Sequence, residues 1–146
     1  MVIAVGAQAM AEACANRMWS DDHASQSLGM ELIAVVPGAA TMSMTVCQQM
    51  ANGHGACHGG FISALADSAF AFACNSRGTV TVASGFEINF LEPALVGDVL
   101  VADATEVAVR GRSGIYDVTV RRGDTVIAEF RGRSRSLGRA ILEEER

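Results

Sequence analysis

The chain has 146 residues, of which 50% are hydrophobic and 18% are charged, so it suits one compact domain and excludes a disordered chain. Its net charge of -5 at pH 7 argues against a nucleic-acid-binding surface. We therefore treat residues 1–146 as a single domain and expect no nucleic-acid partner.

The first third of the chain predicts a helix followed by a β-hairpin. Apolar residues recur at helical spacing over residues 7–19, and a second helical turn precedes the first strand. Residues 31–36 form a strand-like run that ends at the turn signal Pro37-Gly38. Polar and apolar side chains then alternate over residues 41–47, which predicts the second strand of the hairpin.

The middle of the chain predicts a loop and one long helix. Residues 48–57 are polar and rich in glycine, and residues 58–76 are apolar on nearly every side. A helix that is apolar all round must be covered on every face. We therefore expect the rest of the chain, together with a partner subunit, to surround it.

The last part of the chain predicts four strands in a meander, over residues 79–91, 99–110, 115–121 and 125–137. Glycine-rich turns separate the last three strands, and Gly123-Asp124 is a strong hairpin signal. We expect residues 138–146 to be a frayed tail. The predicted class is α+β, with a mostly antiparallel sheet wrapped around the long helix.

Asp67 is an ionisable residue in the middle of this apolar helix. A buried carboxylate without a partner costs several kcal/mol or changes its pKa. Its helical neighbours Ser63, Ala64, Phe70 and Ala71 are small or apolar, so they leave room for a ligand. We interpret Asp67 as a functional carboxylate rather than as a surface residue of the helix.

The sequence His58-Gly59-Gly60 opens the long helix. The first N–H groups of a helix lack internal partners, and the positive end of the helix dipole lies behind them. Glycine also lets another group approach the backbone closely. The helix start therefore suits an anion, or an oxygen that becomes negative in a transition state.

The loop offers three further readings. His54, Cys57 and His58 have the spacing H-x-x-C-H, but no second ligand cluster completes a tetrahedral metal site, so we assign no metal. Cys57 and His58 are adjacent and seldom face each other as a nucleophile and base would need to. Asn52 either orients a water or a carbonyl group, or only forms a turn beside Gly53.

The run "NGHGACHGGFISALADSAFAFACNS" resembles the signature of the hotdog-fold acyl-CoA thioesterases of phenylacetate degradation. The later runs "FLEPALVGDVLVADA", "GIYDVTV" and "FRGRSRS" also resemble that family, so the similarity covers nearly the whole chain after Ala9. The resemblance implies a hotdog fold and hydrolysis of an acyl-CoA thioester. It also implies that the acyl group is phenylacetyl or hydroxyphenylacetyl.

The same resemblance implies roles for individual residues. Asp67 matches the catalytic carboxylate, and the amide of Gly59 matches the group that polarises the thioester carbonyl. Asn52 matches a loop asparagine that holds water or substrate, and His58 matches a supporting histidine. The resemblance places substrate-binding positions at Gly60, Ser84 and Ser68, although "GFE" after Ser84 departs from the small residues of the family.

Thioester hydrolysis needs a donor for the oxyanion and a carboxylate, so we expect no metal and no cofactor beyond the CoA of the substrate. Arginines near residues 110–112 and 131–135 are candidate contacts for the CoA phosphates. The four cysteines form no C-x-x-C pair, and the N-terminus lacks the pattern of a signal peptide or a membrane span. We expect a cytoplasmic protein with no membrane association.

Two rival functions remain at this level. One is a noncatalytic acyl-CoA-binding module of the same fold, and the other is a hotdog dehydratase, which needs a histidine and an acid placed for proton transfer. The joint presence of Asp67, Gly59 and Asn52 favours the thioesterase. Its acyl group could also be another medium-chain or aryl group.

Gly59 and Asp67 lie eight residues apart on one helix, which is about 12 Å along its axis. One thioester cannot easily touch both groups of the same chain. Two antiparallel copies of the helix can combine the Gly59 of one chain with the Asp67 of the other. We therefore expect a homodimer with shared sites, and the resemblance implies a tetramer of two such dimers.

Overall fold

The computed structural model describes the backbone of residues 2–142 and the side chains of residues 6–142. Its helices are α1 (Val2–Asp21), α2 (His23–Ser27) and α3 (Gly59–Cys74), with a short 3-10 helix, η1 (Gln48–Met50), in the loop before α3. Its strands are β1 (Glu31–Val36), β2 (Ala39–Thr45), β3 (Thr79–Phe90), β4 (Val99–Arg110), β5 (Ser113–Arg122) and β6 (Thr125–Ala140).

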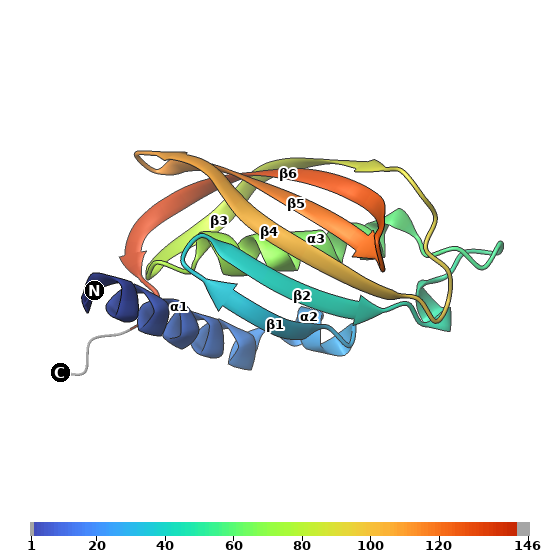
Figure 1. Ribbon diagram of the computed structural model, residues 1–146, viewed down its shortest axis with the longest axis horizontal. Helices are drawn as coiled ribbons and strands as arrows, with labels where there is room; N and C mark the ends of the chain where they lie inside the picture. Colours follow the sequence, from blue (N-terminus) through green and yellow to red (C-terminus); the bar gives the residue numbers. More distant parts are fainter. Residues whose placement is uncertain (1, 143–146) are drawn as a thin grey trace.

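The six strands form one antiparallel sheet in the order β1-β2-β4-β5-β6-β3. Figure 1 shows this sheet curved around α3, with α1 and α2 beside β1. A sheet that is apolar on its inner face must bury that face, and the apolar helix fills the concavity. The predicted α+β class and hotdog fold are therefore confirmed.

The predicted meander is wrong for its first strand. β3 pairs with β6 rather than with β4, and residues 91–98 carry the chain across so that β4 pairs with β2. Neighbouring strands in a sequence pair often but not always. β3 and β6 form ten paired positions, from Thr79 and Ala140 to Phe90 and Ala128.

α3 packs its most apolar face against the sheet. Its buried residues are Ile62, Leu65, Ala66, Ala69, Phe70, Phe72, Ala73 and Cys74. The ring of Phe70 lies 5.5 Å from that of Tyr116 and 5.8 Å from that of Phe130. Gly132 permits this contact, because a Cβ atom there would come within 2.9 Å of the Phe70 ring.

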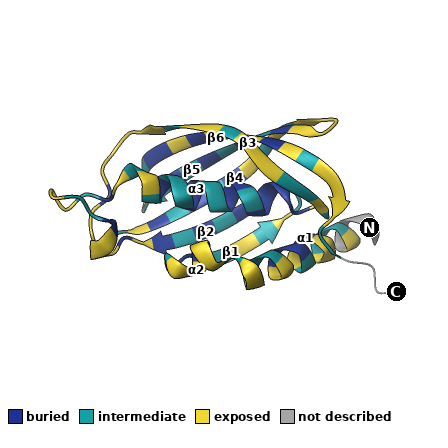
Figure 2. Ribbon diagram, turned by 180° about the vertical axis from the view of Figure 1, so that it is seen from behind, coloured by how far each residue is buried: buried dark blue, intermediate teal, exposed yellow. Residues whose placement is uncertain are grey.

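The expectation that α3 is covered on every side is not met within this protomer. Ser63, Ala64, Asp67 and Ala71 are only half-buried. Figure 2 shows α3 with segments of intermediate burial, in teal, among its buried ones. The side of α3 that carries Asp67 is therefore accessible. The apolar residues of β3 on the α3 side of the sheet are more open still, since Val82, Phe86 and Phe90 are 42%, 42% and 50% exposed.

Several element ends differ from prediction. α1 begins at Val2 rather than near residue 7, and β2 begins at Ala39 rather than residue 41. The predicted frayed tail is wrong at its start, because β6 continues to Ala140 and the Ile141 amide donates to the Gly78 carbonyl at 2.9 Å. Residues 143–146 of that tail lie outside the described residues. Across the described part of the chain, no helix has both the length and the apolar character to span a membrane.

Candidate active site

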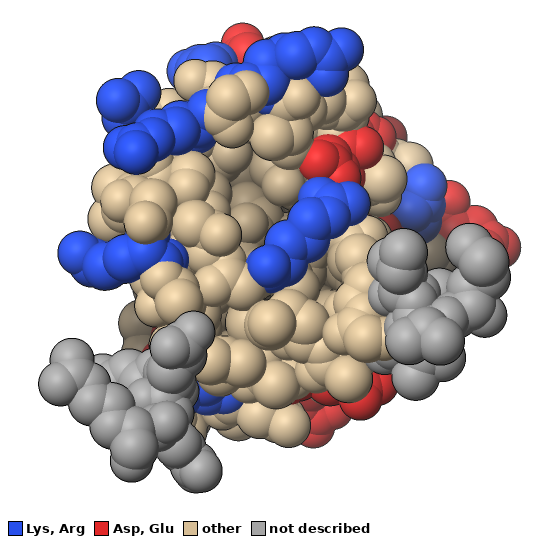
Figure 3. Space-filling model, turned by 90° about the vertical axis from the view of Figure 1, so that its left-hand side faces the viewer, with Lys and Arg blue, Asp and Glu red and all other residues tan. Residues whose placement is uncertain are grey.

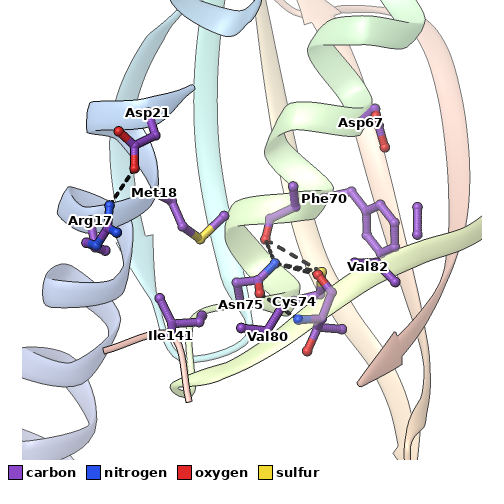
Figure 4. Close-up of a pocket in the computed structure, with 13 residues that line it drawn as sticks. Arg17, Met18, Asp21, Asp67, Phe70, Cys74, Asn75, Val80, Val82 and Ile141 are labelled. Atoms are coloured by element: carbon purple, nitrogen blue, oxygen red, sulfur yellow. Dashed lines mark hydrogen bonds and ion pairs between the residues drawn. The ribbon is translucent and has the colours of Figure 1, made fainter. Parts of the chain in front are cut away.

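Asp67 opens into a cavity of about 480 Å³, which we call the Asp67 cavity. Its walls come from α1, α3 and β3, with apolar side chains from Met18, Phe70, Val80 and Val82 (Figure 4). The carboxylate has no hydrogen-bond or ion-pair partner among the side chains described. A carboxylate beside an apolar cavity is poorly solvated, so it is set up to react with a bound molecule.

The pKa of Asp67 is raised above its ordinary value, first by burial and second by the negative charge of Asp22. Both effects disfavour the ionised form. A raised pKa increases the affinity of the Asp67 carboxylate for a proton, which is the direction that favours a general base.

Asp22 belongs to a short polar network between α2 and α3. Its carboxylate accepts from the Ser25 amide at 3.0 Å and from the Ser25 hydroxyl at 2.7 Å, which caps α2. The Ser25 hydroxyl also shares a 2.8 Å hydrogen bond with Ser68. Ser68, which we expected to bind substrate, is thus engaged in positioning α2 against α3, close to Asp67 in sequence.

The start of α3 is formed by His58, Gly59 and Gly60. His58 is the N-cap residue, and its exposed side chain makes no capping hydrogen bond. Among the described residues, the amides of Gly59 and Gly60 have no acceptor, as expected for the first turn of a helix. Gly59 lines a second cavity of about 430 Å³ together with Ile62 and Phe90, which we call the Gly59 cavity.

Gly59 and Gly60 differ in how much space surrounds them. A Cβ atom on Gly59 would come within 2.7 Å of the Phe90 ring, whereas one on Gly60 would meet nothing within 4 Å. Only Gly59 therefore needs the absence of a side chain for packing. This difference provides a matched pair of substitutions at the helix start.

Asn52 organises the loop before α3. Its side-chain carbonyl accepts from the backbone amides of His54 at 2.9 Å and Ala56 at 3.2 Å. Its backbone amide donates to the Ala56 carbonyl at 2.8 Å. The turn-forming role that the sequence left open is therefore present. The side-chain NH₂ of Asn52 makes no hydrogen bond to the described residues and remains able to contact a ligand.

The two alternative chemistries of the loop depend on how its histidines and cysteine are placed. Within the part of the chain described, no three His, Cys, Asp or Glu residues are grouped to hold a metal ion. The Cys57 thiol points to the backbone carbonyl of His58 at 3.5 Å rather than to its imidazole. Burial raises the pKa of Cys57, with a smaller contribution from Cys47, so it is a poor thiolate nucleophile.

The structure does not bring all the expected site residues together in one protomer. Asp67 and Gly59 line different cavities, and the lining residues of the two cavities do not overlap. Ser84 donates to the Arg133 carbonyl at 3.1 Å and lines a third cavity with Arg110 and Arg133. Ser84 is therefore not beside Asp67 in this chain, because it faces away from the cavity that its neighbours Val82 and Ala83 line.

Sequence reasoning missed most of the wall of the Asp67 cavity. Cys74 could have been found, since it follows Asp67 by seven residues and so lies on the same face of the helix. Asn75, Thr81 and Met18 carried no such signal. Their place in the wall depends on how α1 and β3 pack against α3.

Many of the C-terminal arginines are held in ion pairs with strand neighbours. Arg131 donates to both carboxylate oxygens of Asp117, at 2.7 and 2.9 Å, and lowers the pKa of that carboxyl. Further pairs join Arg77 to Glu106, Arg121 to Asp103, Arg122 to Asp98 and Arg133 to Glu87. Arginine side chains also gather around a hollow at one end of the molecule (Figure 3). No ion pair within the described residues engages Arg110, Arg112, Arg135 or Arg139.

Comparison with known proteins gives a consistent relationship. The family model of the thioesterase superfamily matches residues 54–129. Acyl-coenzyme A thioesterase PaaI of Escherichia coli is 43% identical over 132 residues, covering 89% of this chain and 94% of the relative. A putative esterase of Archaeoglobus fulgidus is 33% identical over 112 residues, covering 77% of this chain and 73% of the relative.

Solved structures agree with this relationship. The Escherichia coli PaaI protein from the phenylacetic acid degradation operon has a TM-score of 0.89 and 40% identity, and the match covers 91% of this chain and 97% of that one. A mutant of phenylacetic acid degradation protein PaaI from Thermus thermophilus has a TM-score of 0.75 and 35% identity, covering 77% and 97%. The chain belongs to the thioesterase superfamily and is a thioester hydrolase of the hotdog fold.

Proposed function

We propose that this protein hydrolyses phenylacetyl-CoA or hydroxyphenylacetyl-CoA to the free acid and CoA. The observation that carries the proposal is the half-buried Asp67 carboxylate at an apolar cavity of a size suited to a small aromatic acyl group. The similarity to the PaaI proteins of Escherichia coli and Thermus thermophilus supports this choice of acyl group.

Asp67 acts on the thioester carbon in this proposal, either by activating water or by direct attack. The Gly59 amide donates a hydrogen bond to the carbonyl oxygen, and the helix dipole favours the negative charge that develops there. Asn52 fixes the loop before Gly59 and presents its NH₂ group to water or substrate. His58 supports the helix start, and Gly60 leaves open space beside it for the substrate.

The separation of Asp67 and Gly59 into different cavities supports a homodimer with shared sites. In such a dimer, each chain supplies Gly59 to the Asp67 of its partner. β3 supports the same assembly, since it is an edge strand whose residues Val82, Phe86 and Phe90 are exposed apolar side chains. A tetramer of two such dimers remains a prediction.

The proposed hydrolysis uses no metal and no separate cofactor. Arginines without an ion pair in the described chain, such as Arg110, Arg112 and Arg135, are the candidates for contacting the CoA phosphates. The four free cysteines are compatible with the cytoplasmic location that we expect for a CoA-dependent reaction.

A hydrolysis screen tests the proposed function. Purified protein is given acetyl-, hexanoyl-, palmitoyl-, phenylacetyl- and hydroxyphenylacetyl-CoA, and free thiol release is measured with and without a metal chelator. We expect the two aryl substrates to react fastest, with unchanged rates in chelator. A preference for palmitoyl-CoA, or chelator inhibition reversed by added metal, would contradict the proposal. Binding of acyl-CoA without thiol release would instead identify a noncatalytic module.

A further inference from the structure

Two residues form a partition between the Asp67 cavity and a neighbouring cavity. Cys74 and Thr81 line both the Asp67 cavity and this neighbour of about 180 Å³, which we call the rear chamber. Cys74 lies seven residues after Asp67 on α3, or about 10 Å along the helix axis. Figure 4 shows Asp67 at one end of the cavity and Cys74 with Asn75 at the other. Cys74 and Thr81 therefore lie between the Asp67 cavity and the rear chamber.

Asn75 holds this partition in place. Its side-chain NH₂ donates to the Thr81 carbonyl at 2.9 Å and to the Ala71 carbonyl at 2.8 Å, and its Oδ1 accepts from the Thr81 amide at 2.8 Å. Asn75 is only 5% exposed, so these bonds are shielded from water. They fasten the backbone of β3 to the end of α3. Asn75 therefore holds the partition in place through the backbone of Thr81 and does not use the Thr81 hydroxyl.

The rear chamber differs chemically from the Asp67 cavity. Tyr116 and Ser134 line it and are 3% and 5% exposed as whole residues. Their hydroxyl oxygens keep some accessible surface, and no hydrogen bond within the described residues engages them. Arg112 and Ser136 add further polar groups to its lining. An apolar acyl end would leave these hydroxyls unpaired, whereas an acyl end with a hydroxyl group could bond to them.

We propose that the Cys74–Thr81 partition sets the length limit of the acyl group. The acyl group lies along α3 from Asp67 toward Cys74, and the two side chains, braced by Asn75, stop it before the rear chamber. This inference rests on the proposed function, because it assumes that the thioester carbon is held at Asp67. It assigns Cys74 and Thr81 as specificity-determining residues that do not take part in the chemical step.

The test compares two substrates that differ by two methylene groups, 4-hydroxyphenylacetyl-CoA and 4-(4-hydroxyphenyl)butyryl-CoA. The longer one extends further toward the rear chamber, which Tyr116 and Ser134 line, once the partition is thinned. In Cys74→Ala we expect the ratio of kcat/KM, longer over shorter substrate, to rise about tenfold or more. In Cys74→Leu, which fills the end of the cavity, we expect kcat/KM for the shorter aryl substrate to fall relative to acetyl-CoA.

Two further variants make the test specific. Thr81→Ala thins the partition from the other side and keeps the Asn75 bonds, because those bonds use the Thr81 backbone. If circular dichroism shows that Cys74→Ala does not fold, Thr81→Ala provides the test instead. Cys14→Ala is the matched control, since Cys14 is a fully buried cysteine on α1 that lines neither the Asp67 cavity nor the rear chamber. Its substrate ratio should equal that of the wild type.

The outcomes separate the two proposals. An active wild-type enzyme whose substrate ratio stays the same in folded Cys74→Ala, Thr81→Ala and Cys74→Leu would overturn the length limit alone. A folded wild-type protein that hydrolyses no acyl-CoA would overturn the proposed function, and the length limit with it.

Discussion

Asp67 is expected to lower the stability of the fold and, at the same time, to act in the proposed reaction. Its folded-state pKa is raised above the value of an ordinary aspartate, chiefly by burial. The folded chain therefore binds this proton more tightly than the unfolded chain does. As pH rises from the unfolded pKa through the folded one, the ionising carboxyl lowers the free energy of unfolding. At neutral pH, Asp67 is thus expected to destabilise the fold.

The Asp67→Asn substitution should separate these two effects. We expect kcat to fall on the order of a hundredfold or more, because the base or nucleophile is lost. The melting temperature at pH 7 should rise, because no charge remains to be buried. Asp124→Asn, in the exposed β5–β6 turn, is the control and should change neither quantity. Near-normal turnover in Asp67→Asn would remove Asp67 from the reaction.

The pH dependence gives a second prediction at this residue. The ionised carboxylate is the active form, so kcat/KM should fall as pH drops through the raised pKa of Asp67. Asp22 is the second cause of that raised pKa, after burial. In Asp22→Asn, whose side-chain oxygen can still cap α2, the acidic limb should move to lower pH. The measurement is a pH–rate profile of both proteins with a fast aryl substrate. An unmoved acidic limb in an active Asp22→Asn enzyme would contradict it.

The start of α3 is the element whose local structure matters most to the proposed chemistry. Its glycine amides lack acceptors among the described residues, and the helix dipole points the same way. The loop that leads into it is tied at Asn52 by two amide contacts. The helix start therefore offers donors whose positions are set before a ligand arrives, which is the condition for stabilising an oxyanion well.

Gly59→Ala and Gly60→Ala form a matched pair that tests this element. The added methyl group on Gly59 would collide with the Phe90 ring at 2.7 Å, whereas that on Gly60 meets open space. We expect Gly59→Ala to shift the helix start or Phe90 and to lower kcat by roughly tenfold to a thousandfold, the range for losing an oxyanion donor. Gly60→Ala, which adds its methyl group to open space and leaves Gly59 unchanged, should lose clearly less activity than Gly59→Ala. Equal losses in both folded variants would argue against a specific role for the Gly59 amide.

At the scale of the whole molecule, the open side of α3 and the exposed apolar residues of β3 point to incomplete coverage. A single chain leaves Val82, Phe86 and Phe90 about half-exposed at a sheet edge. Edges of this kind are sites of pairing between chains. A two-fold dimer that buries them would also bring the Gly59 of one chain toward the Asp67 of the other.

Complementation tests this assembly. Chains carrying Asp67→Asn and chains carrying Gly59→Ala are unfolded, mixed in equal amounts and refolded, and each parent is refolded alone as a control. About half of the dimers should be mixed, and each should contain one intact site, so roughly a quarter of all sites should recover activity. If both parents fold, subunits exchange and the mixture is no more active than its parents, then the shared-site dimer is wrong.

Local pattern alone predicted the bounds of β1 and β4 and the type and approximate place of α3. It also singled out Asp67, because one carboxylate in an apolar helix is unusual in any fold. It failed for β3, whose partner is β6. It also did not show that Ser84 and Asp67 line different cavities of the same chain. Alternation shows that a segment is a strand, but it does not show which strand it pairs with or which side chains share a cavity.

The sequence by itself determined the helix, the strands, the glycine amides at the helix start and the carboxylate two turns along it, because propensity, side-chain period and capping act between near neighbours. Only the tertiary structure decided that β3 is the edge strand next to β6. It alone also decided that residues of α1 and β3 line the Asp67 cavity. It also decided that Cys74 and Thr81, braced by Asn75, end that cavity. These features depend on contacts between segments distant in the chain, and such contacts are settled by packing of the whole core rather than by any local preference.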